Sequence, residues 1–385
     1  MLKAFTFLGT GEYQETTYSK HDDKNKICKT DLFPIALAQL YEPEKIIAFT
    51  TPKVRTDKKE DLEKIRKTLG DKFTTVNIPN GNSTAELWDI FTQCVDVDVI
   101  AENDEIILDI THAFRSIPLL IFIVAAYLRQ VKNVELKHII YGAFEARDME
   151  TDKTPIFDLT PFVKLLDWMN AVNVFQNSGD ARSIANLNVQ KDIAAALANL
   201  SNALLTNRTF EAQNAAFNFN GLNFDSPEAP PFQMLIDQLK QSYQRMAVYN
   251  SSENPESSLR AQYLQIKWYV ENQHYLQAIT LMREWLISWK CLEDTENWLN
   301  MDNRNRVEQN LNERAREKGS PLAAGLAKAL SPADQEAIKL WDRCVGLRND
   351  LAHCGMRYNP KSATDAIREI EELFSDFEKF VRQTK

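Results

Sequence analysis

The first 160 residues alternate short apolar, β-branched runs with amphipathic segments, a pattern that predicts strands alternating with helices. Strands are expected at residues 4–8, 45–49, 74–78, 106–108 and 137–141, with a hairpin over 145–158. Helices are expected at residues 31–41, 57–69 and 85–95, and over the long apolar segment from 118. A repeated strand–helix unit favours a mostly parallel sheet with helices on both faces. Residues 1–160 are therefore predicted to form a Rossmann-like α/β domain.

Beyond residue 160 the apolar residues recur at helical spacing, and no strand is predicted. Turn-rich segments at residues 218–231 and 250–255 divide this part of the chain. We therefore expect a helical connector over 161–255 and a helical terminal domain over 256–385, which makes the fold class α/β plus all-α. The helices are expected at residues 162–175, 189–205, 232–249, 257–271, 275–292, 335–351 and 364–382.

Composition and charge narrow the possible functions. A net charge of −9 excludes a chain that grips a phosphate backbone over its whole surface, so any nucleic acid must bind at a local patch. Five scattered cysteines without a C-x-x-C pair favour a reducing compartment and indicate no zinc site. The longest apolar run, residues 117–128, is shorter than the roughly 20 residues that span a bilayer. The amino-terminal sequence lacks a signal-peptide pattern, and we expect a cytoplasmic protein.

A polar turn follows the buried strand at residues 106–108 and precedes the long apolar segment. Open α/β sheets present ligand-binding groups at such strand ends, and free N–H groups at a helix start suit a phosphate. The candidate ligand-binding residues of this turn are Asp109, Thr111, His112, Arg115 and Ser116. Other strand ends should face the same crevice, which adds Thr50, Thr51, Asn80, Gly81 and Asn82.

The first strand ends in Gly9-Thr10-Gly11, which is either a tight turn or part of a ligand site. A nicotinamide site is disfavoured because Gln14 stands where the dinucleotide fingerprint needs a third glycine. His21, His138 and His274 have no partner in the sequence and are expected to be structural or exposed.

A second candidate site lies near the carboxyl end, in the hexapeptide from Arg348 to His353, before the helix-ending Gly355. On an ideal helix Arg348 and His353 lie about 140° apart and about 7.5 Å along the axis, so they form no compact dyad. Two copies related by a two-fold axis can bring both pairs into one cleft. A histidine can move the proton of a ribose 2′-hydroxyl and an arginine can stabilise charge on the phosphate. Asn349 is expected to hold the phosphate or to orient the histidine.

Both motifs together resemble the CRISPR-associated ribonucleases of type III systems that join a CARF sensor domain to a HEPN domain. R-x-x-x-x-H is the HEPN signature, and Asp109-Ile110-Thr111-His112 is similar to the Asp-x-Thr-His motif of CARF domains, with Ala113 where glycine is usual. The matching positions are Gly9, Thr10, Gly11 and residues 109–116 for the ligand, and Arg348 and His353 for catalysis. Residues 161–255 carry no motif of this family.

The resemblance implies a homodimer or larger assembly whose paired sensor domains bind one cyclic oligoadenylate, most often cyclic tetra-adenylate. Binding would switch on a metal-independent endoribonuclease that cuts single-stranded RNA in antiviral defence, with no cofactor, metal or membrane partner. Two alternatives stay open: a sensor that signals to a partner through an inert helical domain, and a sensor that also degrades its own activator.

Overall fold

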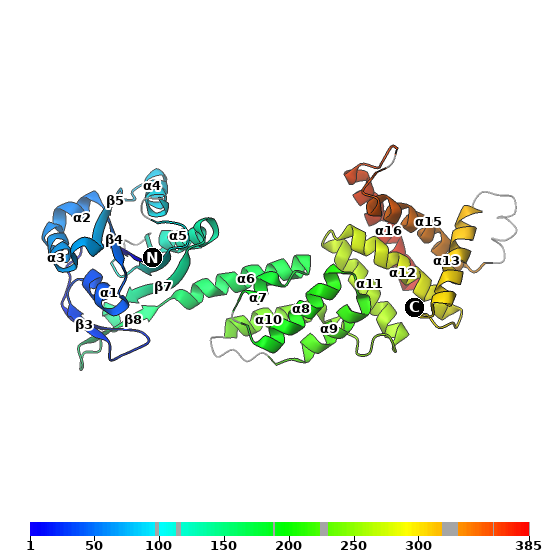
Figure 1. Cartoon of the computed structure of the whole chain (residues 1–385), viewed down its shortest axis with the longest axis horizontal. Helices are drawn as coiled ribbons and strands as arrows, with labels where there is room; N and C mark the ends of the chain where they lie inside the picture. Colours follow the sequence, from blue (N-terminus) through cyan, green and yellow to red (C-terminus); the bar gives the residue numbers. More distant parts are fainter. Residues whose placement is uncertain are drawn as a thin grey trace. The chain divides into compact units, whose positions relative to one another are not determined.

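The computed structural model describes residues 1–96, 100–112, 117–187, 189–223, 230–317, 330–356 and 358–384, apart from the side chains of Pro118 and Pro230. The chain forms two compact units, Met1–Leu166 and Asp167–Lys385, whose elements are labelled in Figure 1. Arg115 and Ser116, which the sequence predicts to bind ligand, lie outside the described residues.

The first unit is built on an eight-stranded sheet of order β3-β2-β8-β7-β6-β1-β4-β5. Five of the strand pairings are parallel, and only β2–β3 and β7–β8 are antiparallel. The predicted mostly parallel α/β sheet is therefore confirmed. The strands are β1 (Leu2–Phe7), β2 (Thr16–Ser19), β3 (Ile27–Thr30), β4 (Lys45–Thr50), β5 (Phe73–Asn77), β6 (Glu105–Asp109), β7 (Glu135–Gly142) and β8 (Lys153–Asp158).

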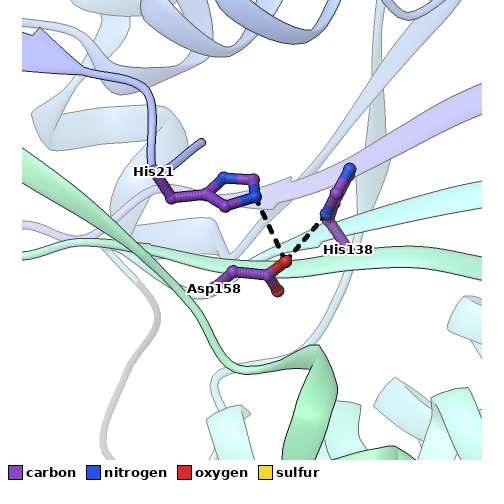
Figure 2. Close-up of side chains that lie close together, drawn as sticks. All are labelled: His21, His138 and Asp158. Carbon is purple, nitrogen blue, oxygen red and sulfur yellow. Dashed lines mark hydrogen bonds and ion pairs between the residues drawn. The ribbon is translucent and has the colours of Figure 1, made fainter. Parts of the chain in front are cut away.

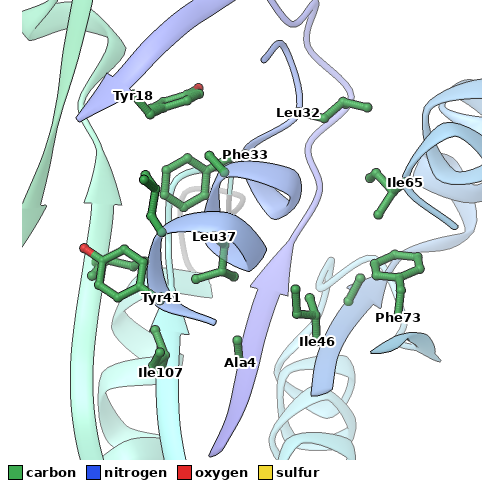
Figure 3. Packing of buried hydrophobic residues seen from close by; sticks show 14 of the residues in the cluster. Ala4, Tyr18, Leu32, Phe33, Leu37, Tyr41, Ile46, Ile65, Phe73 and Ile107 are labelled. Atoms are coloured by element: carbon green, nitrogen blue, oxygen red, sulfur yellow. The ribbon is translucent and has the colours of Figure 1, made fainter. Parts of the chain in front are cut away.

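Helices cover both faces of this sheet because successive strand residues point to opposite sides. Ala4 of β1 and Ile107 of β6 join one core cluster, which Figure 3 shows packed with α1 residues such as Phe33. Their neighbours Phe5 and Leu108 join the other cluster, which is covered by α4 and α5. The helices of this unit are α1 (Phe33–Tyr41), α2 (Pro52–Asp57), α3 (Lys59–Leu69), α4 (Thr84–Val95) and α5 (Ile117–Lys132).

Three local features differ from the sequence prediction. Strands β2 and β3 were not predicted, because they have four residues each and mix polar with apolar side chains. An additional short helix, α2, precedes α3, since Pro52 occupies a first-turn position that tolerates proline and Thr51 caps that turn. The expected hairpin over 145–158 is instead formed by β7 and β8, joined through the short 3₁₀ helix η2 (Phe144–Ala146).

The second unit is helical, and no strand follows β8 among the residues described, as predicted. Three helices, α7, α9 and α13, were not predicted; α7 has only four residues, and α13 buries only Val307 and Leu311, so its apolar stripe is too thin to detect. Within the same described residues, no helix combines the length and apolar content needed to cross a membrane. The helices are α6 (Thr160–Ser178), α7 (Arg182–Ala185), α8 (Lys191–Leu205), α9 (Thr209–Gly221), α10 (Pro230–Gln244), α11 (Pro255–Glu271), α12 (Tyr275–Glu293), α13 (Met301–Arg316), α15 (Pro332–Ala352) and α16 (Ala363–Gln383).

Candidate functional site

The order of the strands reverses between β1 and β6. Strands β4 and β5 lie on one side of β1, and the chain then returns to place β6 and β7 on the other side. Ligands of open α/β sheets bind beyond the carboxyl ends of the strands at such a reversal. Here the turns after β1 and β6 approach so closely that a Cβ atom on Gly9 would lie 3.0 Å from the carbonyl oxygen of His112. Glycine at position 9 therefore permits the two turns to meet.

The carboxylate of Asp109 connects strand β1 to the turn after β6 by hydrogen bonds. Its Oδ2 accepts a hydrogen bond of 2.5 Å from the hydroxyl of Thr6 in β1, and its Oδ1 accepts one of 2.8 Å from the backbone N–H of Thr111. The hydroxyl of Thr111 in turn accepts a bond of 2.9 Å from the N–H of Gly142 at the end of β7. Asp109 is fully buried, so its role in this structure is to position the turn rather than to touch a ligand.

A cleft of about 320 Å³ opens at this point of the sheet. Four of the predicted ligand residues line it, namely Gly9, Gly11, Thr111 and His112. Aromatic and acidic side chains that the sequence analysis did not single out complete its walls, among them Tyr13, Tyr18, Tyr141, Phe144 and Glu145. Tyr141 and Glu145 come from the end of β7 and the turn after it, which the sequence analysis did not treat as a ligand-binding strand end.

His112 is the most unusual polar group of the cleft. Burial, aided by the positive charge of Lys58, lowers the pKa of its imidazole to about 4, so the ring is neutral near pH 7. Its Nε2 atom is buried and finds no hydrogen-bond partner among the described residues. The ring lies 4.5 Å from that of Tyr13, whose hydroxyl donates to the carbonyl of Gly9 at 2.6 Å. A buried unpaired nitrogen in a cleft is a group that a ligand can satisfy.

Among the described residues, the charged side chains that line the cleft are mainly acidic. Glu12, Asp31 and Glu145 line it, although Asp31 forms an ion pair of 2.8 Å with Lys64. The hydrogen bond from Tyr141, 2.7 Å long, lowers the pKa of Glu145 and keeps it ionised. Carboxylates and aromatic faces suit ribose hydroxyls and bases better than phosphates. The predicted phosphate donors Arg115 and Ser116 lie outside the described residues.

The remaining predicted ligand residues do not line this cleft. Thr10 is exposed, and Thr50 is fully buried with its hydroxyl donating to the carbonyl of Val76 at 3.3 Å. The hydroxyl of Thr51 accepts from the N–H of Val54 and caps α2. The turn Asn80, Gly81 and Asn82 follows β5, which is separated from β1 by β4.

The predicted catalytic residues lie at the end of α15 in the second unit. Arg348 donates to the side-chain oxygen of Asn349 at 3.1 Å, and the backbone N–H of His353 donates to the carbonyl of Asn349 at 3.0 Å. The helix ends in two residues with positive φ, Cys354 and Gly355, and the N–H of Gly355 closes back on the carbonyl of Asp350. His353 is exposed, whereas Arg348 and Asn349 are half-buried. Asn349 therefore contacts the guanidinium, whereas the imidazole of His353 is exposed.

Comparison with known proteins relates the two units to proteins of CRISPR systems. Residues 3–145 match the CARF domain of the CRISPR system endoribonuclease Csx1. Residues 164–250 match the second domain of the CRISPR-associated protein MJ1674. These matches cover the cleft, whereas Arg348 and His353 lie beyond both of them.

The chain is also similar over most of its length to MJ1674 itself, from Methanocaldococcus jannaschii. The two sequences are 26% identical over 352 residues, an alignment that covers 84% of this chain and 51% of that protein. The chain therefore spans about half the length of the curated relative that it matches. Together the comparisons support a CRISPR-associated protein that contains a CARF domain.

Substituting Asp109→Asn should alter how stability depends on pH. Burial raises the pKa of Asp109 to about 6, although bonds from Thr111 and Thr6 oppose the shift. A carboxyl whose pKa is raised on folding stabilises the fold below about pH 4, and this contribution is lost as pH rises through about 6. Between about pH 4 and about pH 6, the free energy of unfolding of the wild type should therefore fall by up to about 3 kcal/mol relative to that of Asp109→Asn. Urea unfolding at a series of pH values measures the difference. Parallel pH profiles for the two proteins would contradict the assignment.

Proposed function

We propose that this protein is a cyclic oligoadenylate sensor whose helical unit is an endoribonuclease, acting in type III CRISPR antiviral defence. The observation that carries the proposal is the cleft between the Gly9 turn and the Thr111–His112 turn, within a domain that matches a Csx1 CARF domain. CARF domains bind cyclic oligoadenylates. The R-x-x-x-x-H hexapeptide at the end of α15 supplies groups suited to RNA cleavage in the same chain.

The size of the cleft favours binding of one nucleotide unit per chain. About 320 Å³ lies at the lower end of the range for small-molecule sites, roughly 300–1,000 Å³. A ring of four adenylates is several times larger than one nucleotide, so it must extend beyond a single cleft. Two copies of the chain, each contributing a cleft, would accommodate such a ring symmetrically.

An exposed apolar stripe on α5 supports pairing of two copies. Leu119, Ile123, Tyr127 and Val131 recur every four residues, so they share one face of the helix, and Leu119 is 70% exposed. Trp88 on α4 extends this stripe. Its ring packs edge-to-face on that of Phe91, and Phe91 packs edge-to-face on Tyr127 with ring centroids 5.2 Å apart. Because α5 begins at Ile117, soon after Thr111 and His112 in the sequence, a dimer formed through this face would bring these two residues of both copies toward one interface.

The proposed chemistry of the helical unit needs only protein groups. His353 would take the proton from the ribose 2′-hydroxyl or return it to the leaving oxygen, and Arg348 would stabilise the charge that builds on the phosphate. Asn349 already orients the guanidinium by a bond of 3.1 Å. The exposure of His353 leaves it accessible to a single-stranded RNA.

Substitution of the cleft should weaken binding of the activator. Thr111→Ala removes a hydroxyl that lines the cleft and holds the N–H of Gly142, so the affinity for cyclic tetra-adenylate should fall at least about tenfold. Isothermal titration calorimetry measures it. Asn80→Ala is the matched control, because Asn80 lies at the same edge of the sheet but outside the cleft. Equal losses in both variants would show that the cleft is not the binding site.

Substitution of the α5 stripe should yield monomers. Ile123→Glu places a charge in the centre of an apolar face, so the dimer should dissociate in sedimentation-velocity experiments. Met149→Glu serves as the control, because Met149 is also exposed but lies in the turn before β8. A dimer that survives Ile123→Glu would place the interface elsewhere.

Cleavage of a fluorescent single-stranded RNA, in EDTA and with cyclic tetra- or hexa-adenylate, tests the enzymatic proposal. Arg348→Ala and His353→Ala should each reduce activator-dependent cleavage by about 10²-fold or more while binding of the ring persists. Arg382→Ala, which removes only the surface ion pair with Glu378, is the control. Unchanged cleavage in the first two variants would contradict the catalytic assignment. Tight binding of a ring without any cleavage by the wild type would instead indicate a signalling module.

A further inference from the structure

Three side chains that lie far apart in the sequence meet on the first unit, away from the cleft (Figure 2). His21 follows β2, His138 lies in β7 and Asp158 ends β8. They meet because β8 runs antiparallel to β7 and parallel to β2, so that β2 and β8 end on the same side, with Asp158 paired with Ile140 of β7. None of the three lines the cleft, which lies at the other end of β7.

The distances within this His–Asp cluster are those of a hydrogen bond and an ion pair, and they are close to the separation of ligand atoms around one metal ion. Oδ2 of Asp158 lies 3.0 Å from Nδ1 of His138 and 3.4 Å from Nε2 of His21. One ligand atom from each residue falls within 4.8 Å of the other two. Tetrahedral zinc with bonds of 2.0–2.1 Å separates its ligand atoms by about 3.3 Å. Small side-chain movements would therefore place an ion between the three atoms.

His21 and Asp158 each have a second polar atom, which is hydrogen-bonded to a neighbouring group. Nδ1 of His21 bonds to the hydroxyl of Tyr41 at 2.9 Å. Oδ1 of Asp158 accepts hydrogen bonds from the N–H and the hydroxyl of Thr160. Nε2 of His21 and Nδ1 of His138 both face Oδ2 of Asp158, as Figure 2 shows. Outer partners of this kind fix the orientation of metal ligands and tune their affinity.

One positive charge lies next to His21 in the sequence, that of Lys20, and it is paired with Asp22 at 3.2 Å.

We propose that His21, His138 and Asp158 form a binding site for a divalent transition-metal ion, with zinc the best-suited ion. Two imidazoles and one carboxylate select such ions over magnesium and calcium, which prefer oxygen ligands. Three protein ligands leave a fourth position open to water or to an external ligand. The ion would cross-link the turn after β2 to β7 and to the end of β8. This proposal does not depend on the proposed sensor or ribonuclease function.

Metal content of the full chain tests the proposal. The protein is stripped with a chelator, dialysed against zinc chloride and analysed by inductively coupled plasma mass spectrometry. The wild type should retain one zinc ion per chain, and cobalt(II) should give the intense visible absorption of a low-coordinate site. His138→Ala and Asp158→Asn should both lose the ion, whereas His353→Ala, which removes an exposed histidine of the other unit, should keep it. A wild type without zinc, or retention of zinc by the first two variants, would overturn the proposal.

A second variant guards against loss of metal through misfolding. Tyr41→Phe keeps all three ligands and the packing of the ring but removes the hydrogen bond to His21. Its affinity for zinc should fall by about tenfold to a hundredfold with the stoichiometry unchanged. Circular dichroism confirms folding of each variant, and the zinc-dependent rise in Tm should be absent only in those that lack a ligand. An unchanged affinity in Tyr41→Phe would show that the ion binds elsewhere.

Discussion

The buried carboxylate of Asp109 is the interaction on which the ligand cleft depends. It ties Thr6 of β1 to the turn after β6, and through Thr111 it reaches Gly142 at the end of β7. Three neighbouring strand ends are thereby connected through the side chains of Asp109 and Thr111. The arrangement carries an energetic cost, since burial raises the pKa of this carboxyl to about 6. Such a cost is typical of groups that pre-organise a binding site.

The topology of the sheet places that carboxylate beneath the turns that line the cleft. Because β1 is flanked by β4 and β6, the strand order reverses beside it, and the cleft lies at the carboxyl ends of the strands at this reversal. Gly9 then lets the two backbones approach to a distance that a Cβ atom would obstruct. The cleft thus requires the strand order, the buried acid and the missing side chain together, and each of these lies on a different segment of the chain.

The sequence predicted those features that local periodicity encodes. Strand β6 is an uninterrupted buried run and α16 buries Ile370, Phe377 and Val381 at helical spacing, so both were evident. Gly9, Thr111 and His112 lie within a few residues of predicted strand ends and were found for that reason. The position of β7 relative to β1, by contrast, depends on pairings between distant strands, so Tyr141 and Glu145 were not found. Strand order cannot be read from periodicity, and for this reason Asn80 was included among the expected ligand-binding residues.

Strand β7 makes hydrogen bonds both to the cleft and to the start of α6. Gly142 at its carboxyl end bonds to Thr111 of the cleft, whereas Ile139 donates to the hydroxyl of Thr160, at the start of α6, at 2.9 Å. Because each unit is one continuous stretch of chain, the chain passes from the first to the second only once, within α6. A ligand in the cleft can bias the second unit only if it binds two arrangements of the first unit with different affinity. Hydrogen bonds from β7 reach both the cleft, through Gly142, and the start of α6, through Ile139, and Asp158 of the His–Asp cluster binds the same Thr160.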